Sequence, residues 1–220
     1  MSQLFLDPTN ILNGCKNFQR VPATLPQAVR ALGHLPDVSQ LLPGDLILIS
    51  PITPSFVQKQ IQKVQTNGGY HQDDARWTHA AVYLGSDFSI CDATRKGVRH
   101  NSLLDLIPNH RIRVRRDPTL DADSRWRIAL SATLQLGTSY GIRSVLTIWI
   151  RSVQGFHEPQ NTGTKSRSAI ICSELYADAF LAATGRTLEW NHPGKEVSPA
   201  LLSFVPELVD VAVGWLKLPA

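Results

Sequence analysis

The chain has 220 residues, of which 43% are hydrophobic and 18% charged, and its 22 lysines and arginines against 18 acidic residues give a net charge of +4. This composition excludes an intrinsically disordered chain and a long coiled coil. The three cysteines, Cys15, Cys91 and Cys172, are too few and too irregularly spaced for a disulfide framework or a thiolate zinc site.

The first half of the chain reads as a lead-in followed by the start of a sheet. Residues 1–40 contain one predicted helix, 25–32, which Gly33 ends. A Pro-Gly turn precedes a buried strand at 46–50. Thr53 is the predicted N-cap of a helix that runs to about residue 66. The later elements are a polar loop at 67–77, a hairpin of 78–84 with 88–93, and a short strand after Gly97.

The second half reads as one more strand and a set of helices. A strand is predicted at 111–115, and helices at 123–136, 144–153 and 170–184, with a polar loop at 155–168. Ser198 and Pro199 begin a last short helix. Strands and helices do not alternate strictly, so we expect an α+β domain with an antiparallel sheet. We treat 1–220 as one domain with a core at 41–185 and a C-terminal extension at 186–220.

The densest basic patch alternates arginine with apolar residues from Arg111 to Arg116. This is strand spacing, which predicts an arginine face and a buried face with Ile112 and Val114. We interpret the arginine face as a solvated strand face. The alternative is a nucleic-acid or anionic-surface patch, which no aromatic interleaving or motif supports.

Cys172 follows a polar loop and opens a predicted helix of about a dozen residues. Free backbone N–H groups and the helix dipole at such a position favour the thiolate and could stabilise an oxyanion. The alternative is a buried, inert cysteine. A nucleophilic thiol needs a base, and His79 is the outstanding candidate because it lies inside an apolar strand; a core histidine with satisfied hydrogen bonds is its alternative.

The predicted hairpin relates His79 to an acidic residue. If Gly85-Ser86 is a two-residue turn, His79 lies directly opposite Asp92. Directly paired residues share a face about 5 Å apart, so Asp92 would orient the imidazole. The alternative for Asp92 is a strand-end or turn residue.

Residues 40–185 resemble the circularly permuted papain-like cysteine hydrolases, in the YiiX-like branch related to NlpC-type peptidases and lecithin–retinol acyltransferase-like proteins. The ordered motifs are Pro43-Gly44-Asp45-Leu46-Ile47, His79-Ala80-Ala81-Val82-Tyr83-Leu84-Gly85, Asp92-Ala93 with Gly97-Val98, and Cys172-Ser173-Glu174-Leu175. The resemblance implies an antiparallel sheet or partial barrel packed against helices, with the nucleophile Cys172 at a helix N-terminus, His79 as base and Asp92 as the third polar residue. The family typically has glutamate at this third position.

Three aromatic residues are candidates for substrate binding. Trp77 and Tyr83 flank the histidine, and either could line a cleft or belong to the core. Tyr140 lies in a Gly-x-x-Tyr segment that resembles one found in the family. Asp45 matches a family motif, and we assign it to hydrogen bonding at a turn.

The resemblance implies a thiol peptidase or amidase without metal or organic cofactor, acting on a peptide amide such as a peptidoglycan stem peptide. A lipid or thioester acyl hydrolase or acyltransferase is the alternative within enzymes, and a catalytically silent binding domain is the alternative outside them. No apolar stretch approaches the roughly 20 residues of a membrane helix, and no leader is visible. We therefore expect a cytoplasmic protein, or one exported by a leaderless route. A toxin of this kind would have an inhibitor or immunity protein as partner.

Overall fold

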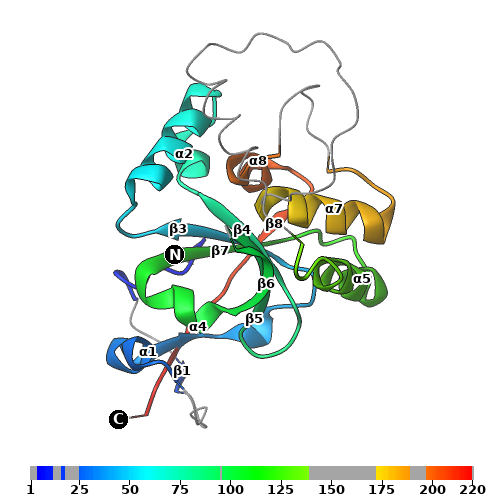
Figure 1. The fold of residues 1–220 in the computed structure, drawn as a ribbon. Coiled ribbons are helices and arrows are strands. Elements are labelled where there is room, and N and C mark those ends of the chain that lie inside the picture. The colour runs from blue at the N-terminus through cyan, green and yellow to red at the C-terminus, as the bar shows by residue number, and fades with distance from the viewer. Residues whose placement is uncertain are drawn as a thin grey trace.

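A six-stranded antiparallel sheet lies at the centre of the protein, and its strand order is β6-β5-β4-β3-β7-β8 (Figure 1). The computed structural model describes residues 4–11, 16–17, 25–94, 96–138, 172–188 and 197–219. The strands are β3 (Leu46–Pro51), β4 (His79–Tyr83), β5 (Ser89–Thr94), β6 (Gly97–Ser102), β7 (His110–Arg116) and β8 (Val209–Val211). The predicted α+β architecture with an antiparallel sheet is confirmed.

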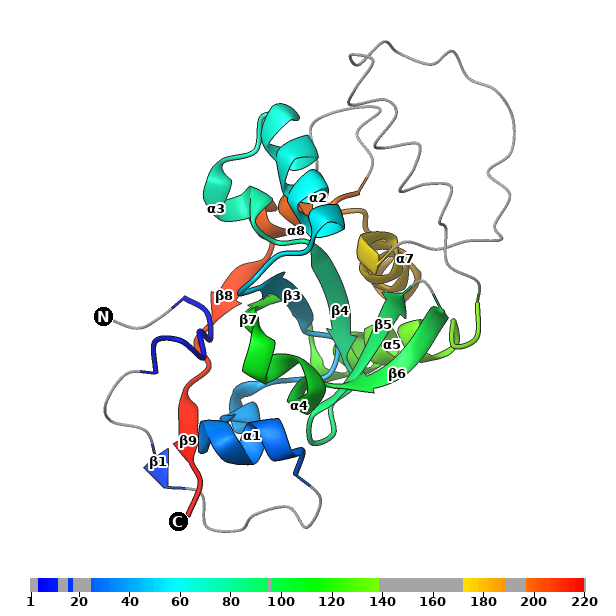
Figure 2. The same cartoon turned by 60° about the vertical axis from the view of Figure 1, so that its left-hand side comes forward.

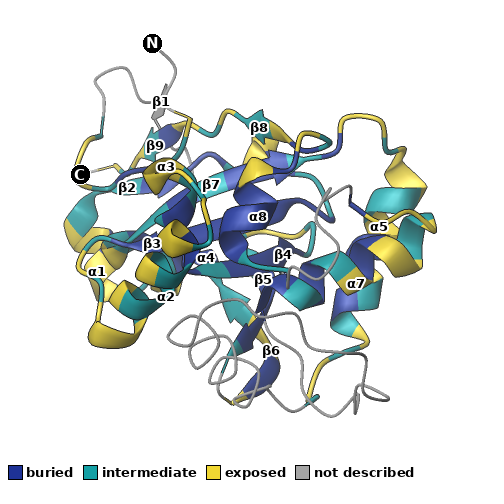
Figure 3. Ribbon diagram, turned by 90° about the horizontal axis from the view of Figure 1, so that it is seen from above, coloured by how far each residue is buried: buried dark blue, intermediate teal, exposed yellow. Residues whose placement is uncertain are grey.

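Helices cover both faces of this sheet. Helices α5 (Ala122–Thr133), α7 (Cys172–Thr184) and α8 (Pro199–Phe204) contribute to one core, together with alternate side chains of β3, β4 and β5. On the opposite face, α1 (Gln27–Leu32) and α4 (Leu103–Leu106) pack on the other set of alternate residues. Because both faces are covered, the central strands are apolar on both sides, and Figure 3 shows them and α8 as buried.

The two ends of the chain meet in a second, smaller sheet of order β1-β9-β2. Its strands are β1 (Lys16–Asn17), β9 (Trp215–Lys217) and β2 (His34–Pro36), with β1 parallel and β2 antiparallel to β9. Figure 2 shows β9 beside β1 and α1. The C-terminal segment therefore supplies a strand to each sheet, since β8 pairs with β7 in the larger one.

Helix α2 (Phe56–Asn67) begins two residues later than the sequence suggests. Its N-cap is Ser55 and not Thr53, because Ser55 and Gln58 form a reciprocal capping box. The segment predicted as a loop at 67–77 contains a one-turn helix, α3 (Gln72–Ala75). Two short 3-10 turns, Val38–Gln40 and Ile107–Asn109, complete the described elements. The helix expected at 144–153 and the loop at 155–168 lie outside the described residues.

The arginine face of β7 is covered, so its prediction as a solvated face is wrong. Arg113 forms a bidentate pair with Asp210 at 2.6 and 3.0 Å. Arg115 is 7% exposed and donates to the carbonyl groups of Leu202, Ser203, Val205 and Leu208 at the end of α8. The sequence alternation gave no indication that α8 and the chain after it would fold over this face.

The outer arginines of the same strand are paired as well. Arg111 donates to Asp7 at 2.7 Å, and Arg116 forms two bonds of 2.6 Å with Asp45. The other half of the prediction is confirmed, because Ile112 and Val114 are buried in the opposite core. These internal pairings remove the row of free guanidinium groups on which an anionic-surface hypothesis depends. Among the described residues, no helix is long and apolar enough to cross a membrane.

Candidate active site

The β4–β5 hairpin holds His79 and Asp92 together, although not in the predicted register. Asp92 faces Ala81 and not His79, because the loop spans four residues, 85–88, and the Leu84 N–H donates to the Ser89 carbonyl group. Gly85 and Asp87 adopt positive φ angles of 84° and 44° in this loop. The partner of Asp92 therefore moves by two residues, which preserves the face. The His79 Nε2 atom lies 3.1 Å from the Asp92 Oδ2 atom.

Asp92 is a buried carboxylate, 2% exposed, that interacts with one side chain from each neighbouring strand, His79 of β4 and Arg99 of β6. Arg99 lies directly opposite Asp92 in the β5–β6 register, and its Nε atom is 3.5 Å from the Asp92 Oδ1 atom. Burial alone would raise the pKa of Asp92, but the hydrogen bond and charge of His79, with the charge of Arg99, hold that pKa below its usual value. Asp92 is therefore an anion at neutral pH and a fixed acceptor for the imidazole.

Cys172 is the first residue of α7 and is 7% exposed, on the side of the helix that packs against β4. Its thiol hydrogen-bonds with the His79 ring, and the backbone N–H groups of Ala80 and Ser173 donate to the sulfur. Since Asp92 occupies the Nε2 atom of His79, the Nδ1 atom is the ring nitrogen left for the thiol.

The proton equilibria of Cys172 and His79 favour an ion pair. Burial raises the pKa of the Cys172 thiol, but the charge and hydrogen bond of His79 and the two backbone N–H groups outweigh it and lower that pKa. Burial also lowers the pKa of His79, yet the Cys172 thiolate and the Asp92 carboxylate raise it to about 10. Both shifts favour a thiolate facing an imidazolium over a neutral thiol facing a neutral imidazole.

Gln65, on α2, fixes the segment that leads into His79. Its buried Nε2 atom donates to the carbonyl groups of Ala75 and Trp77, both at 2.9 Å. Its Oε1 atom accepts from the Ala200 N–H at 2.9 Å. One side chain thus joins α2, the start of β4 and α8. Neither Gln65 nor Arg99 was identified from the sequence. The pairing of β6 with β5, which puts Arg99 across from Asp92, is a signal that could have found Arg99.

The other candidates have structural surroundings. Trp77 is 1% exposed and packs edge to face on Phe5, with ring centroids 5.8 Å apart. Tyr83 is also buried, and its hydroxyl donates to the Asp87 carbonyl group. Both aromatic rings thus belong to the cores, Trp77 to the one that contains α7 and Tyr83 to the one on the opposite face. Tyr140 lies outside the described residues.

Asp45 has the turn role expected of it. Its Oδ2 atom accepts from the Leu42 N–H at 2.8 Å, which closes the turn before β3. The preceding Gly44 has a φ of 79°, and a side chain there would meet the Arg125 carbonyl oxygen. The bonds between the Asp45 carboxylate and Arg116 join this turn to β7. Asp45 is therefore a structural residue.

A solved structure shares this arrangement of strands and helices. No family model and no curated protein matches the chain. The crystal structure of metalloprotein YiiX from Escherichia coli O157:H7, DUF1105, matches with a TM-score of 0.55, covering 82% of this chain and 99% of that one. The protein has a YiiX-like fold. The two sequences are 19% identical, so the likeness concerns the fold alone.

The name of the YiiX structure describes that protein as a metalloprotein. In the described part of this chain, His, Cys, Asp and Glu side chains form no group of three or more that could hold a metal ion. The candidate residues instead bond to one another, with the His79 Nε2 atom committed to Asp92. The donor set described here does not fit a resident metal.

Proposed function

We propose that the protein is a cysteine hydrolase of permuted papain-like type, which cleaves an amide bond through an acyl-enzyme. The observation that carries the proposal is the continuous contact from the Cys172 thiol through the His79 ring to the buried Asp92 carboxylate. A nucleophile, a base and an orienting acceptor in this order are the parts that thiol acyl transfer needs.

In the first step, the Cys172 thiolate attacks the amide carbonyl carbon and forms a C–S bond. The carbonyl oxygen becomes an oxyanion beside the start of α7, where backbone N–H groups and the helix dipole stabilise negative charge. Cys172 is the first residue of a 13-residue helix, so its sulfur lies at the positive end of the dipole. No proton needs to be removed from the thiol when the ion pair is already formed.

Collapse of this intermediate breaks the C–N bond. The His79 imidazolium gives its Nδ1 proton to the leaving amine, and the acyl group stays on Cys172 as a thioester. Neutral His79 then removes a proton from water, whose oxygen attacks the thioester carbonyl carbon. The C–S bond breaks and releases the carboxylic acid, while the thiolate and imidazolium are restored. Asp92 holds the ring in the required orientation through both halves.

A peptide amide is the substrate class we favour, and a peptidoglycan stem peptide is its most specific form. The basis of this choice is the resemblance of the ordered motifs to NlpC-type peptidases. An amide substrate would also account for the ion pair. The amine is a poor leaving group and needs a proton from an acid on the enzyme, which the imidazolium partner of the thiolate supplies. That acid is His79, whose pKa of about 10 keeps it protonated in the ion pair at neutral pH.

Alkylation by iodoacetamide at about pH 6 tests this proposal, because only a thiolate reacts quickly. Cys91 is the internal control, since burial raises its pKa to about 12. We expect Cys172 to be labelled on the order of 100 times faster than Cys91, and His79→Ala to remove most of the difference. His100→Ala, which changes an exposed histidine of β6, should have no effect. Equal and slow labelling of all cysteines in the native protein would reject the enzyme in favour of a silent binding domain.

A further inference from the structure

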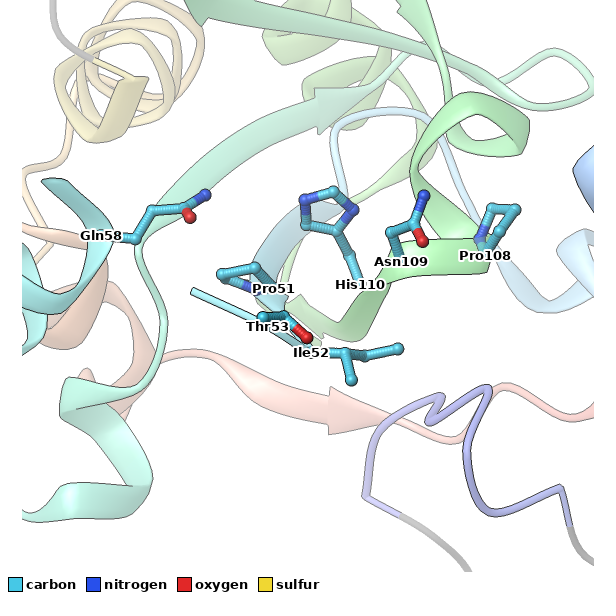
Figure 4. Close-up of a pocket in the computed structure, with 7 residues that line it drawn as sticks. All are labelled: Pro51, Ile52, Thr53, Gln58, Pro108, Asn109 and His110. Carbon is cyan, nitrogen blue, oxygen red and sulfur yellow. The ribbon is translucent and has the colours of Figure 1, made fainter. Parts of the chain in front are cut away.

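A cavity of about 410 Å³ opens between the end of β3 and the start of β7 (Figure 4). Its apolar walls include Pro51 and Pro108, and its polar groups come from Thr53, Gln58, Asn109 and His110. None of the side chains that line it carries a permanent charge. The close-up shows the Gln58 amide directed toward the His110 ring from the opposite side of the cavity.

The cavity lies on the same sheet face as His79. Ile49 of β3 is directly opposite His79 on one side, and Pro51, two residues further along β3, is opposite His110 on the other. Residues two apart in a strand share a face. Two inter-strand spacings of about 4.8 Å and an offset of about 6.6 Å along the strand put the backbones of His110 and His79 on the order of 12 Å apart. That distance corresponds to about three to four residues of an extended peptide.

Existing hydrogen bonds determine what the two polar ends can offer a ligand. The Gln58 carbonyl oxygen accepts from the Ser55 N–H at 2.8 Å, which leaves the amide N–H groups as donors. The Nδ1 atom of His110 lies 2.8 Å from the Leu106 carbonyl oxygen and must donate to it, which leaves the Nε2 atom as an acceptor. Burial, with the positive charge of His79, lowers the pKa of His110 and keeps the ring neutral.

We propose that this cavity is a specificity subsite for an uncharged, amide-bearing side chain of a peptide substrate, in the position of a glutamine or asparagine. The side-chain carbonyl oxygen accepts from Gln58, and the side-chain N–H donates to the His110 Nε2 atom. The subsite rests on the proposed function, since it selects the peptide that reaches Cys172.

Charged side chains fit the cavity less well. A carboxylate could accept from Gln58, but it would face the lone pair of His110 without a donor. An ammonium group could donate to His110, but its charge would be desolvated with no acidic side chain among those lining the cavity. A side-chain amide carries an acceptor oxygen and a donor N–H group in a single plane. These complement the Gln58 N–H donor and the His110 Nε2 acceptor.

Three tripeptide nitriles test the subsite, each carrying glutamine, glutamate or lysine as the third residue from the nitrile carbon. The Cys172 thiolate adds to that carbon, and the His79 proton moves to the nitrogen, which gives a reversible thioimidate. The inhibition constant of each probe is measured from the protection of Cys172 against iodoacetamide. We expect the constant of the glutamine probe to be about 10-fold lower than those of the other two. Equal constants, or no inhibition by any probe, would overturn the subsite.

Substitutions in α2 connect this preference to the cavity. Gln58→Glu retains an oxygen for the Ser55 N–H but removes the donor and adds a negative charge. It should abolish the preference for the glutamine probe and favour the lysine probe about 10-fold. Gln58→Met should abolish the first preference without creating the second. Gln60→Glu makes the same charge change on the same helix outside the cavity lining and should retain the native order.

Iodoacetamide labelling separates a failure of the subsite from a failure of the proposed function. If Cys172 is alkylated rapidly while Gln58→Glu and Gln60→Glu give the same probe order, the subsite is rejected and the thiol chemistry stands. If Cys172 of the native protein is not alkylated at about pH 6, the proposed function fails first.

Discussion

The Nε2 atom of His79 lies 3.1 Å from the Asp92 Oδ2 atom, although the two residues are diagonal and not directly opposed in the hairpin. Diagonal residues on one face remain within reach when one side chain is as long as an imidazole. The four-residue loop shifts Asp92 by two residues along β4 from the position opposite His79, and the two side chains reach across this shift. This bond leaves a single ring nitrogen for Cys172.

Removal of the Asp92 charge should weaken the thiol chemistry. Asp92→Asn retains the shape of the side chain but takes away the anion that helps to raise the pKa of His79. We expect the alkylation rate of Cys172 at neutral pH to fall by about 10- to 100-fold. Asp87→Asn makes the same change in the turn of this hairpin and should react like the native protein. Equal rates in the two variants would show that Asp92 does not support the imidazolium.

The ion pair should also appear in the pH dependence of stability. Between about pH 6.5 and 9.0, the ordinary pKa values of the two groups, folded and unfolded chains bind the same number of protons at Cys172 and His79. Below pH 6.5 the unfolded chain binds one more proton, so acidification reduces stability. Above pH 9.0 the folded chain holds one more, so stability falls as the pH rises through the His79 value of about 10.

Urea unfolding of the native protein and of Cys172→Ser, followed across this range, measures that contribution. The free energy of unfolding of the native protein should decline relative to the variant at both ends of the range. A constant difference from acid to alkaline pH would contradict the ion pair, because it would mean that Cys172 releases no proton on folding.

Gln65 should act as a positioning residue. Gln65→Leu strands the Ala75 and Trp77 carbonyl groups and the Ala200 N–H in the interior, which should cost about 2–4 kcal/mol of unfolding free energy. It should also shift the pH midpoint of Cys172 alkylation upward, which loss of stability alone would not do. Gln62→Leu removes a single bond from a half-buried residue of the same helix and should cost less than about 1 kcal/mol. An unchanged midpoint in Gln65→Leu would reduce Gln65 to a purely structural role.

Arg115 should stabilise the C-terminal segment without affecting the thiol. Arg115→Met removes the donor shared by four carbonyl groups in the last turn of α8 and just after it, and we expect a loss of about 3 kcal/mol in thermal or urea unfolding. Arg127→Met, which breaks an exposed pair with Asp123, should cost less than about 1 kcal/mol. Comparable losses in the two variants would contradict the buried role of Arg115.

The sequence predicts those parts of the fold that local pattern determines. Apolar runs locate β3, β4 and β5, and the helix predicted at 170–184 corresponds to α7. The hairpin register could not be obtained in this way, because Gly85-Ser86 suits a two-residue turn as well as the first half of a longer loop. The prediction that His79 and Asp92 share a face survives only because the register shift is even.

Long-range contacts explain the remaining differences. The alternating arginines of β7 indicate a strand, but nothing near them in sequence shows that residues 202–210 will cover them. The buried role of Gln65 could not be predicted either, because its partner Ala200 is 135 residues away in the sequence. A polar side chain becomes a buried hydrogen-bonding group only through the tertiary fold, which single-sequence patterns do not encode.

The most direct test of the central claim is the titration of the Cys172 thiol, followed by thiolate ultraviolet absorbance as the difference between the native protein and Cys172→Ser. We expect one thiolate to be present already at neutral pH, because the pKa of Cys172 is lowered from the ordinary thiol value of 9.0, and we expect it to be lost in His79→Ala. A thiolate that forms only near pH 9 in the native protein, or that is unchanged in His79→Ala, would contradict it.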